Sequence, residues 1–289
     1  MTKKRWRAGL VSVVLMMVSA ALAVPDASTA RRSTFVAAPV NSRAMWLWGD
    51  EPAAEVIPWA VAEGVSEIFV HVSPTLLVDG DLDRLYEMKQ RADVARIRLT
   101  ALGGDSSWAT DHQAALNWQR TVLRTGVFDG IHLDVEPYLA PGWTTALQAT
   151  QKSYLAMLDK VRAGSTLPLE ADVPFWFGQY RVGGKNLADE VLKRVAAVTV
   201  MSYRDTGTGP NSMLAVSQDW LRRGAVAGKR VRLGAETGPL ADCPYCTFAE
   251  EGATRLAAEL AKVDAETRAT PAFGGIAVHH YGAWRGLPA

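Results

Sequence analysis

Two carboxylic acids that stand two residues apart, Asp134 and Glu136, are the side chains in this sequence best suited to do chemistry. They belong to the stretch Gly130–Glu136, in which apolar and polar residues alternate as in a β-strand. Because successive side chains leave opposite faces of a strand, His132, Asp134 and Glu136 share one face. Two carboxylates so close together cannot both be freely charged, so the pKa of one rises. That carboxyl group can then serve as a general acid near neutral pH.

The residues around this pair form a longer motif. Residues 128–136 read Phe-Asp-Gly-Ile-His-Leu-Asp-Val-Glu. This stretch resembles the fourth-strand motif Asp-x-x-Asp-x-Asp-x-Glu of glycoside hydrolase family 18, the chitinase family. The resemblance implies that Glu136 is the general acid and that Asp134 orients the acetamido group of the substrate. Asp129 matches the first aspartate of the motif, and His132 stands where the family has the second.

A second stretch is similar to the same family. Residues 200–203 read Val-Met-Ser-Tyr, similar to the family's sixth-strand pattern Met-x-Tyr. The match places Met201 in the pattern and Tyr203 where the family has a residue that touches the reacting sugar. Two strands of the chain therefore carry the resemblance.

A different retaining mechanism is also open. Glu136 is followed by Pro137, and a strand-like stretch ends at Glu236, which Thr237 and Gly238 follow. These features resemble the barrel glycosidases that use a Glu-Pro acid/base and a nucleophilic glutamate about 5 Å away. Glu236 would then be the nucleophile, or alternatively a strand-ending carboxylate bonded to Arg232 or to a backbone amide. Glu136 is the acid in both mechanisms.

Other side chains at predicted strand ends are candidates for substrate binding. Indole rings can stack on sugar faces, and for this role we select three of the ten tryptophans. Polar, histidine and tyrosine side chains near the same ends complete the predicted binding set. This set comprises Trp48, His71, Asp129, His132, Asp172, Trp176, Met201, Asp205, His279, Tyr281 and Trp284.

The histidines raise the possibility of a catalytic metal, as in the metal-dependent amidohydrolases. Those barrels use His-x-His after the first strand, whereas this chain has Trp46-Leu47-Trp48 there. We therefore predict neither a metal nor another cofactor, and a carbohydrate as the partner.

The elements that must position these residues alternate between short apolar runs and helical patterns, which favours βαβ units and a parallel sheet. Eight strands are the number in a (β/α)8 TIM barrel. An open doubly wound sheet is the alternative fold. Only about nine residues follow the last strand, so the eighth helix should be absent or a single turn. The predicted strands are Ala44–Trp48, Glu67–Val72, Arg98–Leu102, Gly130–Glu136, Leu169–Val173, Ala197–Ser202, Val231–Glu236 and Gly275–His280; the predicted helices are 53–63, 81–94, 111–125, 144–163, 186–196, 213–224 and 248–265.

The alternation within these strands predicts which way the side chains face. The apolar set should face the helices, and the polar set should face the barrel interior. Glu170 with Asp172, Arg232 with Glu236, and His279 all fall in the polar set. Because a plain core cannot hold so many polar groups, we expect them to gather at the C-terminal end of the strands, where barrel enzymes have their sites.

The chain as a whole has 289 residues with 31 basic and 30 acidic side chains, which gives no electrostatic case for binding nucleic acid or an anionic membrane. Its beginning differs, since a basic start precedes the uncharged apolar run Ala8–Ala23, which ends in Ala-Leu-Ala. We interpret residues 1–23 as a cleaved signal peptide, 24–42 as a linker and 43–289 as one barrel domain. The protein should be secreted, without stable membrane association after cleavage; an N-terminal membrane anchor is the alternative.

The two cysteines form the sequence Cys243-Pro-Tyr-Cys246, which also occurs in glutaredoxins. Here it lies far down the chain in a predicted loop, and the chain is expected to be exported. A local disulfide is therefore favoured over a redox site. Taken together, the residues predict a secreted retaining glycoside hydrolase, with a catalytically silent carbohydrate-binding barrel as the alternative.

Overall fold

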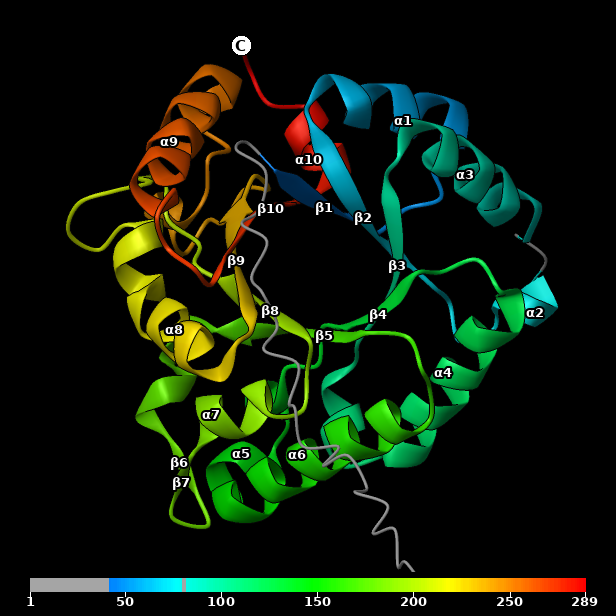
Figure 1. The fold of residues 1–289 in the computed structure, drawn as a ribbon, viewed down its shortest axis with the longest axis vertical. Helices are drawn as coiled ribbons and strands as arrows, with labels where there is room; N and C mark the ends of the chain where they lie inside the picture. The colour runs from blue at the N-terminus through cyan, green and yellow to red at the C-terminus, as the bar shows by residue number, and fades with distance from the viewer. Residues whose placement is uncertain (1–41, 80–81) are drawn as a thin grey trace, which may run out of the picture. The chain divides into compact units, whose positions relative to one another are not determined.

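The computed structural model describes residues 42–79 and 82–289, so the predicted signal peptide and all but the last residue of the predicted linker lie outside the described residues. Eight parallel strands form a closed barrel in the order β1-β10-β9-β8-β5-β4-β3-β2 (Figure 1). This confirms the (β/α)8 barrel and excludes the open sheet. The barrel strands are β1 Arg43–Leu47, β2 Val65–His71, β3 Arg98–Gly103, β4 Gly130–Leu133, β5 Leu169–Pro174, β8 Ala197–Met201, β9 Arg230–Glu236 and β10 Phe273–His279.

Helices lie outside the ring of strands (Figure 1). Each of the seven predicted helical stretches overlaps one of the main helices, and a small hairpin follows β5. In the part of the chain described, no helix is long and apolar enough to cross a membrane. The main helices are α1 Ala53–Ala62, α3 Leu82–Ala95, α4 His112–Thr125, α6 Leu147–Ala163, α7 Leu187–Leu192, α8 Met213–Ala227 and α9 Gly252–Thr267; the short elements are α2 Leu76–Asp79, α5 Gly142–Thr145 and the hairpin of β6 Arg181–Val182 and β7 Lys185–Asn186.

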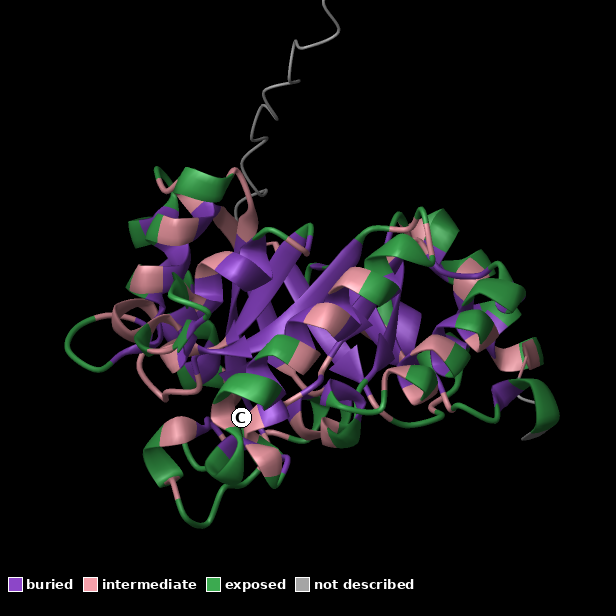
Figure 2. Ribbon diagram, turned by 90° about the horizontal axis from the view of Figure 1, so that it is seen from below, coloured by how far each residue is buried: buried purple, intermediate pink, exposed green. Residues whose placement is uncertain are grey.

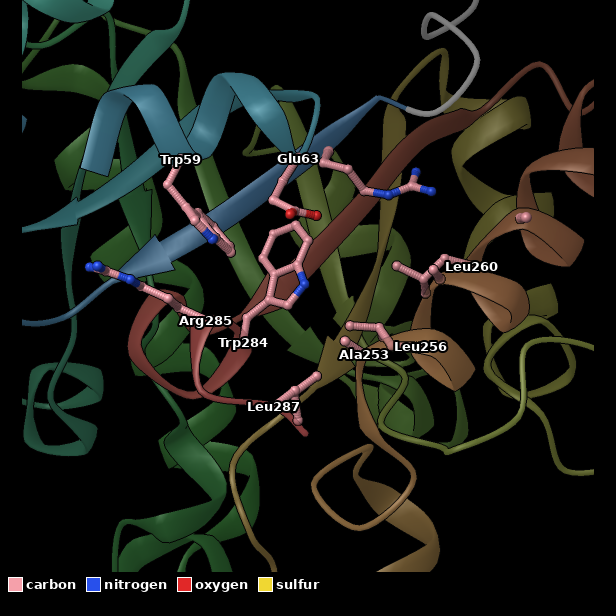
Figure 3. A pocket seen from close by; sticks show the side chains of 11 residues that line it. Trp59, Glu63, Ala253, Leu256, Leu260, Trp284, Arg285 and Leu287 are labelled. Carbon is pink, nitrogen blue, oxygen red and sulfur yellow. The ribbon is translucent and has the colours of Figure 1, made fainter. Parts of the chain in front are cut away.

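The eighth helix is reduced to the five residues of α10, Tyr281–Arg285. Because α10 is too short to cover the space between α1 and α9, a pocket of about 390 Å³ remains there (Figure 3). Trp59 of α1, Leu256 of α9 and Trp284 of α10 line this pocket. The short eighth helix was predicted from the length of chain after the last strand.

This arrangement corrects two of the predicted binding residues. β10 ends at His279, so Tyr281 belongs to α10 and not to the strand. Its ring packs against Trp59 at 5.1 Å, and its hydroxyl accepts a hydrogen bond from Arg285 at 2.6 Å. Trp284 packs against the same Trp59 at 4.8 Å. Both side chains therefore lie in the helical layer, because a helix following the strand no longer alternates between interior and exterior.

The strands are buried on both faces, as the purple strands in Figure 2 show. The predicted alternation holds, since Ile131, Leu133 and the corresponding residues of other strands join the large core between barrel and helices. A smaller apolar cluster fills the barrel itself; it consists of Ala44, Trp46, Phe69, Leu102 and Ala277, with Trp48 packed against it.

One expectation about the barrel interior is wrong. The polar side chains do not all gather at the C-terminal end, because Glu170 and Arg232 lie at the N-terminal end. There Arg232 pairs with Glu67 and, at 2.6 Å, with Glu170, while Arg98 pairs with the same two glutamates at 2.7 and 2.9 Å. Burial would raise the pKa of Glu170, but Arg232, His132 and Arg98 hold it well below its usual range. Glu67, Glu170, Arg98 and Arg232 thus form a network of opposite charges, which we call the polar plug. Their pairing offsets the cost of burying four charges in the barrel interior.

Candidate active site

The predicted catalytic residues lie at the C-terminal end of the barrel. β4 ends at Leu133, three residues earlier than predicted, so Asp134 and Glu136 stand just beyond the strand. The amide of Asp134 still donates to the carbonyl of Gly103 at 3.0 Å. This bond continues the pairing of β3 with β4 by one residue.

Close backbone packing holds Asp134 in place. A Cβ atom at Gly104 would collide with the carbonyl of Asp134, so only glycine permits this approach of the two segments. The Oδ1 atom of Asp134 is buried and has no hydrogen-bond partner among the described residues. Burial, with the nearby Asp172 and Glu136, raises the pKa of Asp134 well above its usual range. A buried carboxyl group of raised pKa, with one oxygen that makes no hydrogen bond, is a candidate for a hydrogen bond to a ligand.

Glu136 is half-buried and receives a short hydrogen bond from the hydroxyl of Tyr138 to its Oε1. Burial raises the pKa of Glu136, against the lowering effect of the Tyr138 hydrogen bond. A raised pKa was expected of one carboxyl group of this pair. Its cause differs from the expected one, because burial outweighs the repulsion between the two neighbouring carboxylates.

Tyr203, just past β8, is close to the same carboxyl groups. Burial raises the pKa of its hydroxyl well above the usual value, and Glu236, Asp172, Asp134 and Glu136 raise it further. The hydroxyl therefore keeps its proton and can donate a hydrogen bond to a ligand. Side chains from β5 and β9 and from the segment after β4 therefore act on the pKa of this one hydroxyl group.

Glu236, at the end of β9, is held by three donors. Its Oε1 accepts from the amides of Thr237 at 2.8 Å and Gly238 at 2.7 Å, and its Oε2 is 2.8 Å from Nδ1 of His279. The indole of Trp48 donates to Nε2 of His279 at 2.9 Å. Because Nε2 accepts, the proton of a neutral imidazole must lie on Nδ1 and point at Glu236. The predicted bond to a backbone amide is thus present, and no bond joins Glu236 to Arg232 in the part of the chain described.

His132 and Asp172 form a buried pair beneath these residues. Nε2 of His132 lies 2.9 Å from Oδ1 of Asp172, whose Oδ2 accepts from the indole of Trp46 at 3.1 Å. The ring of His132 stacks on Phe69 at 3.8 Å. Burial would lower the pKa of His132, but Asp172 and Glu170 raise it to about 9. His132 is thus a buried cation that stands where the family 18 motif has an aspartate.

The remaining predicted binding residues divide between the two ends. The ring of His71 lies 5.6 Å from that of Trp48, and Met201 ends β8 on the interior face. Asp205 and Trp176 follow β8 and β5 and are half-buried. All four are therefore at the C-terminal end of the barrel.

Asp129 is at the opposite end and cannot meet the same ligand. It precedes β4, where its Oδ2 accepts from the amide of Leu99 at 3.1 Å and its Oδ1 lies 3.5 Å from Lys89. Asp134 lies five positions farther along this extended chain, roughly 16 Å away at the strand rise. We therefore withdraw Asp129 from the predicted substrate contacts and assign it to the joining of β3 with β4.

Three residues near the site were not predicted to act there. Tyr138 stands two positions after Glu136 in the sequence, and Trp46 has the same parity as Trp48. These spacings were a usable signal. Tyr154 of α6 comes from a distant element, and its pKa is raised by burial and by Asp172 and Asp134. No local pattern could have connected it with the site.

A disulfide joins Cys243 to Cys246, as predicted. It lies in the loop after β9, whose Tyr245 carbonyl accepts from the amide of Asp205 at 3.0 Å. Arg204 links the same two loops, because its guanidinium lies over the rings of Phe175 and Tyr245. The disulfide therefore braces loops beside Tyr203.

No group of three or more His, Cys, Asp or Glu side chains is arranged to hold a metal ion within residues 42–79 and 82–289. The histidines of the site instead bind carboxylates: His132 pairs with Asp172, and His279 with Glu236. The arrangement provides carboxyl groups of raised pKa and a tyrosine hydroxyl. These groups suit acid catalysis on a neutral ligand.

Comparison with known proteins gives a likeness in fold. No protein-family model matches the chain, and no curated protein matches it by sequence. Among solved structures, the spore cortex-lytic enzyme SleL of Bacillus cereus superposes with a TM-score of 0.55 at 11% identity, over 85% of this chain and 73% of that chain. SleL of Bacillus megaterium QM B1551 gives 0.53 at 12%, over 84% and 71%.

A chitinase from Chromobacterium violaceum ATCC 12472 superposes with a TM-score of 0.53 at 12% identity, over 84% of this chain and 95% of that chain. Identities this low show the fold alone. The structural likeness expected from the family 18 motif is thus confirmed at the level of the fold: the chain has the barrel of a chitinase and of spore cortex-lytic enzymes.

Proposed function

We propose that the protein is a glycoside hydrolase that cleaves a glycan containing N-acetylated amino sugars, with Glu136 as the general acid. One observation carries the proposal. Asp134 and Glu136, both with raised pKa, lie within electrostatic reach of the Tyr203 hydroxyl at the C-terminal end of a barrel that superposes on a chitinase. Barrel enzymes have their sites at that end.

In the proposed reaction the acetamido oxygen of the substrate attacks the anomeric carbon while Glu136 protonates the leaving oxygen. Asp134, through its unused Oδ1, and the Tyr203 hydroxyl orient the acetamido group. Glu136 then accepts a proton from the water that opens the cyclised intermediate, so the configuration is retained. His132 and Asp172 support Asp134 from below.

The environment of Glu236 supports this mechanism over the two-glutamate one. A nucleophile needs an oxygen free to reach the anomeric carbon. Both oxygens of Glu236 already accept hydrogen bonds, two from backbone amides and one from His279. We assign Glu236 to holding His279 and Trp48 at the site.

The test is hydrolysis of a panel of N-acetylglucosamine oligomers and neutral polysaccharides by the wild type and by Glu136→Gln. We expect cleavage of the acetylated substrates alone, with turnover lowered at least ~10²-fold in the variant because positioned acid catalysis is lost. Near-normal turnover by Glu136→Gln would remove the assignment. Binding without cleavage by the wild type would favour the catalytically silent barrel.

A second arm of the test separates the two mechanisms. Fluorinated glycosides leave a covalent sugar on a nucleophilic carboxylate, which mass spectrometry detects. We expect no adduct on Glu236 and inhibition by a thiazoline mimic of the cyclised acetamido group. An adduct on Glu236 would establish the two-glutamate scheme and open neutral sugars as substrates.

We further propose that the enzyme is secreted after cleavage behind Ala23. The basic start and the apolar run of residues 8–23 support this. N-terminal sequencing of the exported protein should begin near Val24. Recovery of membrane-bound protein that retains Met1 would favour the anchor.

A further inference from the structure

Tyr138 connects the proposed acid with an aromatic cluster. It lies in the 3-10 turn Pro137–Leu139, directly after Glu136, and its hydroxyl donates to Oε1 of that residue. Its ring meets the ring of Trp176 at 5.1 Å, and those of Trp143 and Phe177 at 6.4 Å. The cluster is built from the segments that follow β4 and β5. A change in the packing of these rings therefore affects Glu136 through the hydroxyl group of Tyr138.

We propose that Tyr138 is a latch on Glu136: its hydroxyl holds the carboxyl group in the sugar-free protein, and the leaving-group oxygen of a bound glycan takes its place. The first half is a property of the free protein. The second half rests on the proposed function. Tyr138 is a positioning residue in this scheme, because it acts through Glu136 and not on the sugar bond.

The hydroxyl is a permanent donor. Burial raises the pKa of Tyr138 far above the usual value, and Glu136 raises it further, so the phenol does not ionise at any working pH. A permanent donor stabilises the charged form of a carboxylate more than the neutral acid. The latched state thus holds the pKa of Glu136 lower than burial without this hydrogen bond would set it, although that pKa is still above its ordinary value.

Of the groups that affect the pKa of Glu136, the Tyr138 hydroxyl is the one that a ligand can displace. Burial raises the pKa of Glu136, Asp172 from β5 raises it, and His279 from β10 lowers it. Asp134 on its own segment and Tyr203 after β8 complete the surroundings. Asp172 and His279 are held by hydrogen bonds of their own, to Trp46 and Trp48. Displacing the Tyr138 hydroxyl therefore raises the pKa of Glu136.

A ligand can reach the latch. Tyr138 and Trp176 are both half-buried, and the neighbouring Leu139 is exposed. A sugar ring that contacts these side chains would lie beside Glu136. Binding would then move the acid toward its protonated form at the moment when a proton is needed.

The deciding experiment measures the ionisation of Glu136 without substrate. Carbon-13 NMR of glutamate labelled at the side-chain carboxyl, with Glu136→Gln to assign the signal, gives the pKa in the wild type and in Tyr138→Phe. The phenylalanine keeps the ring contacts and removes only the hydroxyl. We expect a higher pKa of Glu136 in Tyr138→Phe, whereas an unchanged pKa overturns the latch.

Tyr180→Phe is the matched control. Tyr180 belongs to the same cluster, 5.2 Å from Trp143 and 5.5 Å from Trp176, but makes no contact with Glu136 among those the structure describes. It should leave the pKa of Glu136 at the wild-type value. An equal shift in both variants would mean that the cluster and not the hydroxyl sets the pKa, which also overturns the latch.

Hydrolysis of N-acetylglucosamine oligomers tests the displacement step. The loss of kcat/KM at high pH reports the pKa of the general acid in the free enzyme, and the loss of kcat reports its pKa in the complex with substrate. In the wild type we expect kcat to fall at a higher pH than kcat/KM does. In Tyr138→Phe we expect the fall of kcat/KM to move up to the pH at which kcat falls. A fall of both at the same pH in the wild type contradicts displacement. Absence of hydrolysis would count against the proposed function and leave the NMR result to decide the latch.

Discussion

The two ends of this barrel use the same kind of side chain in opposite ways. At the N-terminal end Glu67 and Glu170 face Arg98 and Arg232, so each glutamate meets both arginines. At the C-terminal end Asp134 and Glu136 form no ion pair with lysine or arginine in the part of the chain described. The nearest cation is His132, which is paired with Asp172, and burial has the largest effect on the pKa of both groups.

The contrast shows that the surrounding charges, and not the residue type, decide whether the pKa of a buried barrel carboxylate is lowered or raised. Arginines hold Glu170 ionised, with a pKa well below the usual range, against its burial. Burial without such partners holds the pKa of Asp134 well above it. The first arrangement closes the barrel, and the second leaves an acid able to exchange a proton.

The largest expected effect is on stability, from Arg232→Met. This change removes the buried arginine that pairs with Glu67 and Glu170 and leaves Arg98 as the remaining arginine bonded to both. Uncompensated buried charges of this kind cost about 3–5 kcal/mol in the free energy of unfolding. Urea denaturation followed by circular dichroism measures it.

Arg98→Met is the control within the same network. Arg98 bonds the same two glutamates, but its side chain is 30% exposed, so water can compensate for part of its loss. We expect a smaller destabilisation than for Arg232→Met. Equal and small losses in both variants would show that the plug does not depend on charge balance.

A second effect of similar size should appear in the pH dependence of stability. His132 has its pKa raised from 6.5 to about 9, so its contribution is complete below pH 6.5 and is lost as the pH rises toward 9. The shift corresponds to roughly 3 kcal/mol. Asp134 acts with the same sign, because an acid of raised pKa also loses its contribution as the pH rises.

The measurement is thermal or urea unfolding between pH 6 and 9.5, in the wild type and in His132→Gln. The variant should be less stable at pH 6 and should lose less stability across this range. The same comparison in an Asp134→Asn background isolates His132. A wild-type profile that is flat or rises between pH 6.5 and 9 would contradict a buried His132 cation.

The smallest effect is expected from Asp129→Asn. Asp129 lies at the N-terminal end and binds the amide of Leu99, so its neutral analogue should cost about 1 kcal/mol in stability. Turnover on any substrate of the enzyme should change less than about twofold, since the reacting groups are at the other end. Loss of turnover comparable to that of Glu136→Gln would restore Asp129 to the site.

Much of the fold was readable in the sequence, because its signals are local. Short apolar runs that alternate with helical patterns located the eight barrel strands and seven helices within a few residues. The short chain after β10 predicted the truncated α10. The end of β4 was misjudged, because alternation continues through Glu136 although strand pairing does not.

The site was partly readable for the same reason. His132, Asp134, Glu136, Tyr203 and Glu236 were predicted to line one cavity at the C-terminal strand ends, which stays a prediction, and Tyr203 lies within the electrostatic reach of Asp134, Glu136 and Glu236. Tyr281 and Trp284 were misplaced because a helix replaces the strand after His279. Asp129 was misplaced because a motif match does not say which end of the strand its first residue occupies.

The sequence by itself determined the identity and the facing of the candidate catalytic side chains, since both follow from residue type and a period of two. Only the tertiary structure decided which of these groups are neutralised. Arg232 and Glu67 are 165 positions apart, and Trp48 reaches His279 across 231. Partners so distant leave no local pattern, yet they decide whether a buried carboxylate is held as a structural ion or kept as an acid.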